Sequence, residues 1–426
     1  MALKDSYLPE HGNAGYRVAH YDLELDYKPT AARLAGRARL TAVAGAALTS
    51  FTLDLGTFKV DRVLVDGKPA RFTHSAGKLR VRPGRALASG TRFTAEVRYV
   101  GTPRPIRTRE WGDLGWDQLE DGAIVASQPI GAPSWFPCND HVREKATYRI
   151  AVTAPSPYTV VANGILVDGK VGGSTTTWVY EQDVPMATYL ATVQIGQYEQ
   201  IELADGQPAA IPSRLLKPFS VDFGRQPQMM ALFEKLFGPY PFGEYAVVVT
   251  DDDLEVPIEA QGVSVFGANH VDGRRTFERL VAHELAHQWF GNSVGLADWR
   301  HIWLNEGFAC YSEWLWSENS GGPSAAVLAS RARVTLGRLP QDLRIGDPGV
   351  AFMFDDRVYK RGALTLHAVR TLVGDAAFFS LLREWTHTYR HRTVTTDHFI
   401  AVAQRHSSRP LSALLRSWLF ETRLPS

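Results

Sequence analysis

The chain lacks the features that define several large classes of protein. Only two of its 426 residues are cysteines, Cys138 and Cys310, which is too few for a disulfide framework. No apolar run approaches the roughly 18 residues of a membrane-spanning helix, and residues 1–15 are polar, without the apolar core of a secretory signal. We therefore expect a cytoplasmic protein that does not enter a membrane, with both cysteines in its core.

Neither sign of charge is in excess. The 46 basic and 45 acidic residues nearly cancel, so nothing indicates binding to nucleic acid or to an anionic membrane. With 45% hydrophobic residues among its 426, the chain is globular and long enough for two or three domains. It contains no internal repeat and no low-complexity segment.

Residues 1–200 have the pattern of β-strands. Apolar and polar residues alternate through Leu23–Tyr27 and again through Phe93–Tyr99, as they do in strands with one buried face. Asp66-Gly67 and Asp168-Gly169 lie between strand-like runs and favour hairpin turns. Many short strands without a helical stretch predict an antiparallel β-sandwich or a saddle-shaped sheet.

The pattern changes after residue 200. Strands are expected around Ala246–Thr250 and Val263–Phe266, and mainly helical segments follow them to the end. The simplest division gives an N-terminal β domain of residues 1–200 and a mainly helical domain of residues 201–426. The predicted fold class is therefore α+β.

Two histidines stand four residues apart in the run His283-Glu284-Leu285-Ala286-His287. Apolar residues from Phe277 to Phe290 recur at helical spacing, and Gly291-Asn292 is a good helix stop. Residues four apart share one face of a helix, so both imidazoles can reach one ion. Zn²⁺ suits this site because it takes nitrogen and carboxylate ligands tetrahedrally. We expect one Zn²⁺ per chain.

Glu306 supplies the third ligand of this site. It lies in the next expected helix, from Trp303 to about Trp316, so that the ligands come from two helices joined by a loop. Three protein ligands leave a fourth position for water, and this open position distinguishes catalytic from structural zinc. Glu284 follows the first ligand and can point at that water instead of the metal, as a general base should.

With His283, His287 and Glu306 in place, the chain resembles the M1 family of zinc aminopeptidases, which are gluzincins. The segment Trp303–Ala309 around Glu306 is similar to the family's. Further similar segments cover nearly the whole chain in the family's order: Tyr16–Leu23, Phe136–Asp140, Lys145–Tyr148, Met186–Leu190, Tyr240–Phe242 and Trp418–Pro425. The resemblance implies a thermolysin-like fold for residues 201–426.

The resemblance also implies a binding site for the α-amino group of a substrate. The family's GxMEN motif is matched in part by Val256–Gly262, and Glu259 stands where the family's glutamate binds the amine. Ile258 replaces Met and Ala260 replaces Asn, so both are expected in a substrate pocket of altered shape. Gln128 matches a polar residue that helps to hold the amine. Such a carboxylate pairs with an ammonium and places the first peptide bond over the metal.

Phe354–Gly362 resembles the family's YxKG segment, with Arg361 in place of Lys. The resemblance makes Tyr359 the phenol that hydrogen-bonds the oxyanion of the tetrahedral intermediate. Glu313, seven residues after Glu306 on the same expected helix, can orient a zinc-binding histidine. The alternative for Glu313 is a surface role.

We therefore predict a zinc aminopeptidase acting on peptides with a free N-terminus. One alternative is a zinc endopeptidase or epoxide-type hydrolase, although an internal bond offers no ammonium for Glu259. Another is an inactive binding scaffold, which is expected to have lost a zinc ligand or Glu284. Longer family members continue past the segment resembling Trp418–Pro425 into a helical domain that covers the site. We expect a short form with an open cleft, as a monomer or small homo-oligomer.

Overall fold

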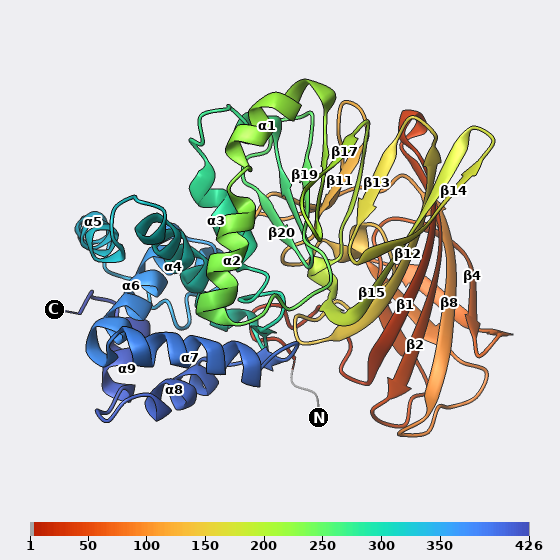
Figure 1. Ribbon diagram of the computed structural model, residues 1–426. Helices are drawn as coiled ribbons and strands as arrows, with labels where there is room; N and C mark the ends of the chain where they lie inside the picture. Colours follow the sequence, from red (N-terminus) through yellow and green to blue (C-terminus); the bar gives the residue numbers. More distant parts are fainter. Residues whose placement is uncertain (1–3, 426) are drawn as a thin grey trace. The chain divides into compact units, whose positions relative to one another are not determined.

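The chain forms two compact units that are not continuous in sequence. The computed structural model describes residues 4–425 (Figure 1). The first unit comprises the chain up to Leu215 together with Phe242–Asn269, and the second comprises Leu216–Pro241 together with the chain from His270 onward. The division into domains at residue 200 stays a prediction. The first unit extends beyond that residue, because it includes the chain up to Leu215 and the segment Phe242–Asn269.

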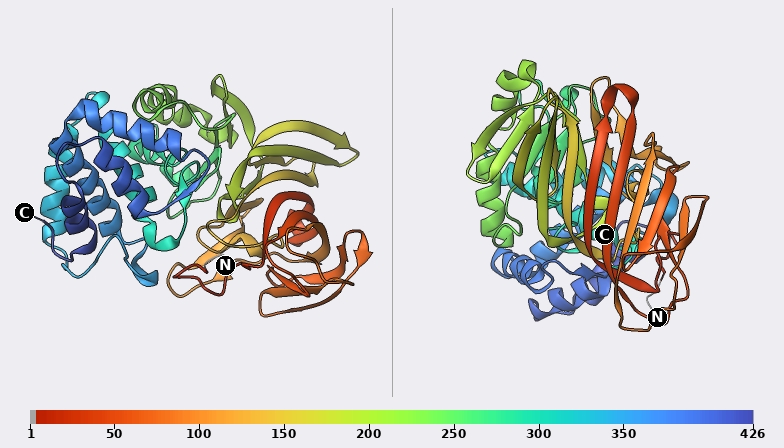
Figure 2. Two further views of the ribbon diagram at one scale, coloured as in Figure 1. Left: turned by 90° about the horizontal axis from the view of Figure 1, so that it is seen from below. Right: turned by 90° about the vertical axis from the view of Figure 1, so that its right-hand side faces the viewer.

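An eight-stranded sheet dominates the first unit (Figure 2, right). Along β1, buried and exposed side chains alternate as predicted, because one face of the strand covers the core. All neighbouring strands are antiparallel except β1 and β12, which are parallel. In spatial order the strands are β14 (Ile165–Gly172), β15 (Thr175–Ala187), β12 (Lys145–Pro155), β1 (Tyr16–Lys28), β2 (Arg33–Ala44), β8 (Arg92–Gly101), β4 (Lys59–Val65) and β5 (Lys68–Pro69).

Of the two predicted hairpin turns in this sheet, one is confirmed and one is wrong. Asp66 and Gly67 join β4 to β5, both with the positive φ of a type I′ turn (50° and 74°). Asp168-Gly169 instead lies inside β14, just after an irregularity in its pairing with β15. The ladder continues to Gly172, and the turn follows at Gly173, where φ is 65°. Strand pairing therefore overrides the local preference of Asp-Gly at this point.

Two smaller sheets complete the N-terminal part of the first unit. One has the order β3 (Phe51–Asp54), β7 (Lys78–Arg82) and β6 (Arg71–Ser75). The other has the order β13 (Thr159–Ala162), β16 (Val193–Gly196), β11 (Ala123–Ala126), β10 (Asp113–Gln118) and β9 (Ile106–Arg107). Cys138 lies in this part of the chain and is buried and free, as is Cys310 in the second unit, which confirms both as core residues.

A fourth sheet, of five strands, contains the strands predicted near residues 246 and 263. Its order is β17 (Glu199–Ala204), β18 (Gln207–Ile211), β19 (Ala246–Val249), β21 (Val263–Phe266) and β20 (Ile258–Ala260). Its apolar side chains form a buried cluster with a residue of β13: Val161, Ala210, Val248, Ala260, Val263 and Val265. The edge strand β20 was not predicted, because it has only three residues and follows Pro257.

All the α-helices of residues 4–425 belong to the second unit (Figure 1). Helix α4 is buried on every side from Trp303 to Trp316, so it is the central helix of this unit. The helices are α1 (Leu216–Asp222), α2 (Gln226–Phe237), α3 (Glu278–Ala286), α4 (Trp303–Asn319), α5 (Ala325–Gly337), α6 (Asp356–Val373), α7 (Asp375–Thr388), α8 (Thr396–Arg405) and α9 (Ser412–Phe420). A two-stranded sheet joins β22 (Gly295–Leu296) to β23 (Thr393–Val394).

Within residues 4–425, none of the helices combines the length and the apolar character needed to cross a membrane.

Candidate metal centre and substrate-amine site

Helix α3 presents His283 and His287 on one face, although it ends earlier than predicted. Its last helical residue is Ala286, and His287 caps it with helical angles (φ −56°, ψ −23°) and an N–H bond to the His283 carbonyl of 3.2 Å. The two imidazole centroids are 4.8 Å apart. From Asn292 to Val294 the backbone N–H groups bond carbonyls five residues earlier, as in a π-helix. The first of these bonds joins Asn292 N–H to the His287 carbonyl at 3.0 Å. This turn directs the Phe290 carbonyl back toward His287.

Glu306 brings the third donor atom from the first turns of α4. Its Oε2 lies 3.6 Å from His283 Nε2 and 3.5 Å from His287 Nε2. The three residues are buried, and their donor atoms all lie within 4.8 Å of one another. Bonds of about 2.0–2.1 Å in a tetrahedral arrangement put two ligand atoms roughly 3.3 Å apart. The three residues therefore fit as ligands of one small cation.

Each imidazole is oriented by a hydrogen bond from its other nitrogen. His283 Nδ1 donates to Glu313 Oε1 at 2.8 Å, and His287 Nδ1 donates to the Phe290 carbonyl at 3.1 Å. Because a carboxylate and a carbonyl only accept, both Nδ1 atoms carry the proton in the neutral ring. The unprotonated Nε2 atoms then face Glu306, which is the tautomer that metal coordination requires.

The electrostatics of this cluster favour positive charge. Burial alone would lower the pKa of His283, but hydrogen bonds to Glu306 and Glu313 raise it to about 10. Burial likewise opposes ionisation of Glu306, yet the charges and hydrogen bonds of His287 and His283 lower its pKa. Two buried carboxylates thus share the site with two imidazoles. A divalent cation can take the place of the protons that these imidazoles would otherwise hold.

Two glycines bring Tyr359 close to this cluster. A Cβ built on Gly307, the residue after Glu306, would lie 2.8 Å from the Cα of Gly362, so α4 and α6 touch backbone to backbone. Side chains at either position would push the helices apart. Tyr359, three residues before Gly362, therefore comes near the metal ligands. Its ring lies nearly parallel to that of His283, with the centroids 6.1 Å apart and an interplanar angle of 15°.

Glu284 lies on α3 beside the first ligand, where only 4% of its surface is exposed. Two charged residues near Glu313 were not predicted. Arg279 Nη1 lies 3.4 Å from Glu313 Oε2, and the charges of Lys360 and Arg279 help His283 to lower the pKa of Glu313 against the effect of burial. Helical spacing could have indicated Arg279, which stands four residues before His283. The position of Lys360 depends on the packing of α6 on α4.

The predicted amine-binding residues lie in the first unit. Gln128 Nε2 donates to Glu259 Oε1 at 2.7 Å, so the structure brings these two side chains together. Neighbouring residues of a strand point to opposite faces. Accordingly, Ile258 and Ala260 pack their side chains into the apolar cluster of the sheet that contains β20, away from the face of β20 that carries Glu259. Their role in substrate binding stays a prediction.

Comparisons with known proteins agree with this fold. The Peptidase M1 N-terminal domain matches residues 18–190, and the Peptidase family M1 domain matches residues 221–418. The solved structure of an M1 zinc metallopeptidase from Deinococcus radiodurans has a TM-score of 0.90 and 31% identity, and the alignment covers 99% of this chain and 97% of that chain. These matches define the class as a two-domain metallopeptidase fold.

The chain belongs to peptidase family M1. Among curated relatives, Aminopeptidase M1-D of Oryza sativa subsp. japonica is 26% identical over 71% of this chain and 37% of its own length. "Probable aminopeptidase 2" of Sulfurisphaera tokodaii is 25% identical over 88% of this chain and 50% of its own length. The chain therefore spans about a third to a half of these curated relatives, but nearly all of the Deinococcus protein.

Proposed function

We propose that this protein is a zinc-dependent aminopeptidase, with one Zn²⁺ held by His283, His287 and Glu306. The observation that carries the proposal is the pair of Nε2 atoms 3.5 and 3.6 Å from Glu306 Oε2, while both Nδ1 atoms donate to protein acceptors. This donor set is typical of catalytic zinc with an open fourth position. Bound there, Zn²⁺ polarises the scissile carbonyl and makes water more acidic.

Glu284 is the proposed general base. It is buried on the helix that carries both histidines, and a carboxylate held in such a place is not screened by bulk water. The carboxylate takes a proton from the attacking water and delivers it to the nitrogen of the leaving amine. The C–N bond then breaks, and Glu284 returns to its starting state.

Tyr359 is the proposed donor to the oxyanion. Its ring stacks beside that of His283, and its hydroxyl is a neutral donor that stabilises developing charge without displacing a metal ligand. Glu313 is proposed to act on a zinc ligand and not on the substrate, because its 2.8 Å hydrogen bond fixes the orientation of the His283 ring.

Glu259 and Gln128 are proposed to bind the α-ammonium of the substrate. Gln128 occupies one acceptor position of Glu259 Oε1, and a carboxylate has further lone pairs for the ammonium. Peptides with a free N-terminus are the proposed substrates. The names of the plant and archaeal relatives as aminopeptidases support this, as does a Deinococcus M1 zinc metallopeptidase variant solved with a Tyr-Ser-Ala substrate.

One pair of substrates tests the proposal against its alternatives. An aminoacyl-arylamide with a free amine should be hydrolysed by the zinc-loaded protein, and the N-acetylated form of the same compound should not. A metal chelator should abolish turnover, and added Zn²⁺ should restore it. Equal turnover of both compounds would indicate an endopeptidase-like site. Stoichiometric zinc without turnover of either compound would indicate a binding scaffold or an epoxide-type hydrolase. Hydrolysis of an epoxide substrate would then distinguish the hydrolase from the scaffold.

A further inference from the structure

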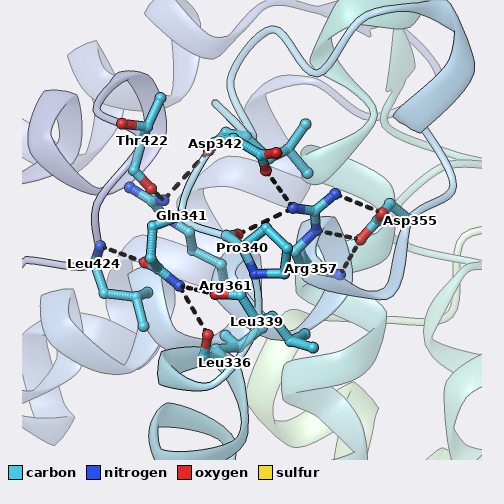
Figure 3. A network of polar contacts seen from close by, with 11 residues as sticks. Leu336, Leu339, Pro340, Gln341, Asp342, Asp355, Arg357, Arg361, Thr422 and Leu424 are labelled. Atoms are coloured by element: carbon cyan, nitrogen blue, oxygen red, sulfur yellow. Dashed lines mark hydrogen bonds and ion pairs between the residues drawn. The ribbon is translucent and has the colours of Figure 1, made fainter.

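The first turns of α6 are tied to the chain segment that follows α9. Helix α6 begins at Asp356, with Asp355 as its cap, and carries Tyr359 in its first turn. Helix α9 ends at Phe420. We call residues 417–424, the last turn of α9 and the chain after it, the clamp segment. Figure 3 shows the polar contacts between this segment, α6 and the loop before α6.

Arg361 makes the central contacts of this network. The residue is 4% exposed, and within residues 4–425 the hydrogen bonds of its guanidinium go to backbone carbonyls. Five of these carbonyls belong to the clamp segment, and one belongs to Leu343 at 3.4 Å. The clamp carbonyls are those of Ser417 (3.2 Å), Trp418 (2.7 Å), Glu421 (2.6 Å), Thr422 (2.7 Å) and Arg423 (3.2 Å).

A cation suits this position because the last carbonyls of a helix carry partial negative charge. Burial lowers the pKa of Arg361 to about 10, which still leaves the side chain charged at neutral pH. The planar fork of a guanidinium has five N–H donors, and here it meets acceptors on all sides. A lysine has three donors on one atom and cannot reach all of these carbonyls. The arginine that replaces the family's lysine therefore makes contacts that a lysine cannot.

Two further residues extend the network. Gln341 Oε1 accepts the N–H of Leu424 at 3.0 Å, while its Nε2 donates to the carbonyls of Leu336 and Leu339 at 2.8 and 3.1 Å. Arg357, one turn before Arg361, donates to Asp355 at 2.8 Å and to Asp342 at 2.6 Å. The clamp segment, the loop before α6 and the start of α6 are thus held together on one side of the helix (Figure 3).

Tyr359 lies between these two arginines in sequence, and residues two apart point to nearly opposite sides of a helix. On its side, Tyr359 stacks beside His283 at 6.1 Å and Lys360 Nζ reaches Cys310 Sγ on α4 at 3.4 Å. The first turns of α6 are therefore fixed from two sides. Contacts with α3 and α4 hold one side, and the clamp segment holds the other.

We propose that Arg361 is a positioning residue, which through the clamp segment sets the place of the Tyr359 phenol relative to His283. The proposal rests on the proposed function for its kinetic consequence, but not for its structural one. The hydrogen bonds of Arg361 go to the clamp segment and to Leu343 and not to His283, His287 or Glu306. Arg361 fixes the helix from which the oxyanion donor extends, and a displacement of about 1 Å at such a donor can cost about 10²-fold in rate.

A double-mutant cycle tests the proposal on the zinc-loaded full chain. Arg361→Lys should lower kcat by on the order of 10–100-fold, with KM little changed and zinc content unchanged. In a Tyr359→Phe background the same change should cost less than about twofold, because the donor that it misplaces is already gone. Arg405→Lys is the matched control, since Arg405 is likewise a hydrogen-bonded arginine of the second unit but bonds Glu384, away from α6.

Equal losses in the two backgrounds would overturn the proposal, because a general weakening of the fold acts whether or not Tyr359 is present. If Arg361→Lys loses zinc or does not fold, Gln341→Leu provides the milder test. This change removes one anchor of the clamp segment and should show the same dependence on Tyr359 with a smaller fall in kcat. A fall that persists unchanged in the Tyr359→Phe background would again refute the inference.

A measurement without turnover separates this inference from the proposed function. With 3-fluorotyrosine in place of the 15 tyrosines, the ¹⁹F resonance of Tyr359 is the one that disappears in Tyr359→Phe. Arg361→Lys should shift or broaden that resonance, and Arg405→Lys should not. A wild-type protein without peptidase activity would refute the proposed function, but the ¹⁹F measurement would still test the positioning role. An unchanged Tyr359 resonance in Arg361→Lys would refute the positioning role and leave the proposed function standing.

Discussion

The metal centre and the amine-binding pair are built in different ways. His283 and His287 come from successive turns of one helix, and each has a second protein partner at its Nδ1. Glu259 lies on a strand of three residues, and its side chain accepts a hydrogen bond from Gln128, 131 positions away in the chain. The metal ligands are thus fixed several times over, whereas the pair depends on a long-range contact.

This difference separates binding the metal from recognising the substrate. Loss of a metal ligand, His283, His287 or Glu306, should lower zinc content and turnover together, because the same bonds serve both. Changes at Glu259 should leave zinc content untouched and should act on substrates according to whether they carry a free amine.

The largest effect is expected at the metal ligands. His287→Ala should remove zinc and abolish turnover, because two ligands do not hold Zn²⁺ in a catalytic geometry. Glu284→Gln should keep full zinc content, since Glu284 is not a ligand, and should lower kcat/KM by about 10²–10⁴-fold. Elemental analysis and turnover of an aminoacyl-arylamide measure both quantities. Wild-type turnover in Glu284→Gln would rule out the assigned base.

The next effect concerns Tyr359. Tyr359→Phe removes one hydroxyl from a ring that keeps its stacking, and it should lower kcat by about 10²–10³-fold with KM little changed. Tyr389→Phe is a matched control, because Tyr389 also stacks on a histidine of the second unit, His398, with ring centroids 5.3 Å apart. A rise in KM without a fall in kcat would make Tyr359 a binding residue instead of an oxyanion donor.

Local periodicity accounts for what the sequence predicted correctly. Alternation in Leu23–Tyr27 and helical spacing around His283 depend on neighbours within a few residues, so a single chain suffices to find them. The wrong turn at Asp168-Gly169 and the missed end of α3 at Ala286 have another origin. Strand pairing decided the first, and a backbone turn that orients His287 decided the second.

The packing of the site was beyond reach for the same reason. The sequence contains Gly307 and Gly362, but only the fold reveals that their backbones touch and so bring Tyr359 to the histidines. The pairing of Gln128 with Glu259 was expected only because the family resemblance placed both at the amine. Helical spacing allowed Glu313 to lie near the ligands, and the 2.8 Å contact with His283 supports an orienting role, which stays a prediction.

A smaller effect is therefore expected at Glu313. Glu313→Gln keeps an oxygen that can accept the His283 Nδ1–H bond but loses the charge, and it should weaken zinc binding by about 10–100-fold. Competition with a metal chelator measures the affinity. Glu318→Gln, on the same helix but paired with Arg370, should leave it unchanged. If Glu313→Gln lowers kcat at full zinc occupancy and leaves affinity intact, the orienting role is wrong.

The smallest effect, and the sharpest test of the separation, is expected at Gln128. Gln128→Ala removes the 2.7 Å bond that orients Glu259 and leaves the carboxylate in place. A bond of this kind contributes about 1 kcal/mol, which corresponds to about a fivefold rise in KM for free-amine substrates. Zinc content and kcat should stay unchanged. Gln197→Ala is the control, because its amide makes a similar 2.6 Å bond to Asp121 in the same unit. In a Glu259→Ala background the Gln128 change should have no further effect, since the group that it orients is gone. An additional loss there would show that Gln128 contacts the substrate directly, and a fall in zinc content would show that the two regions are not energetically separate.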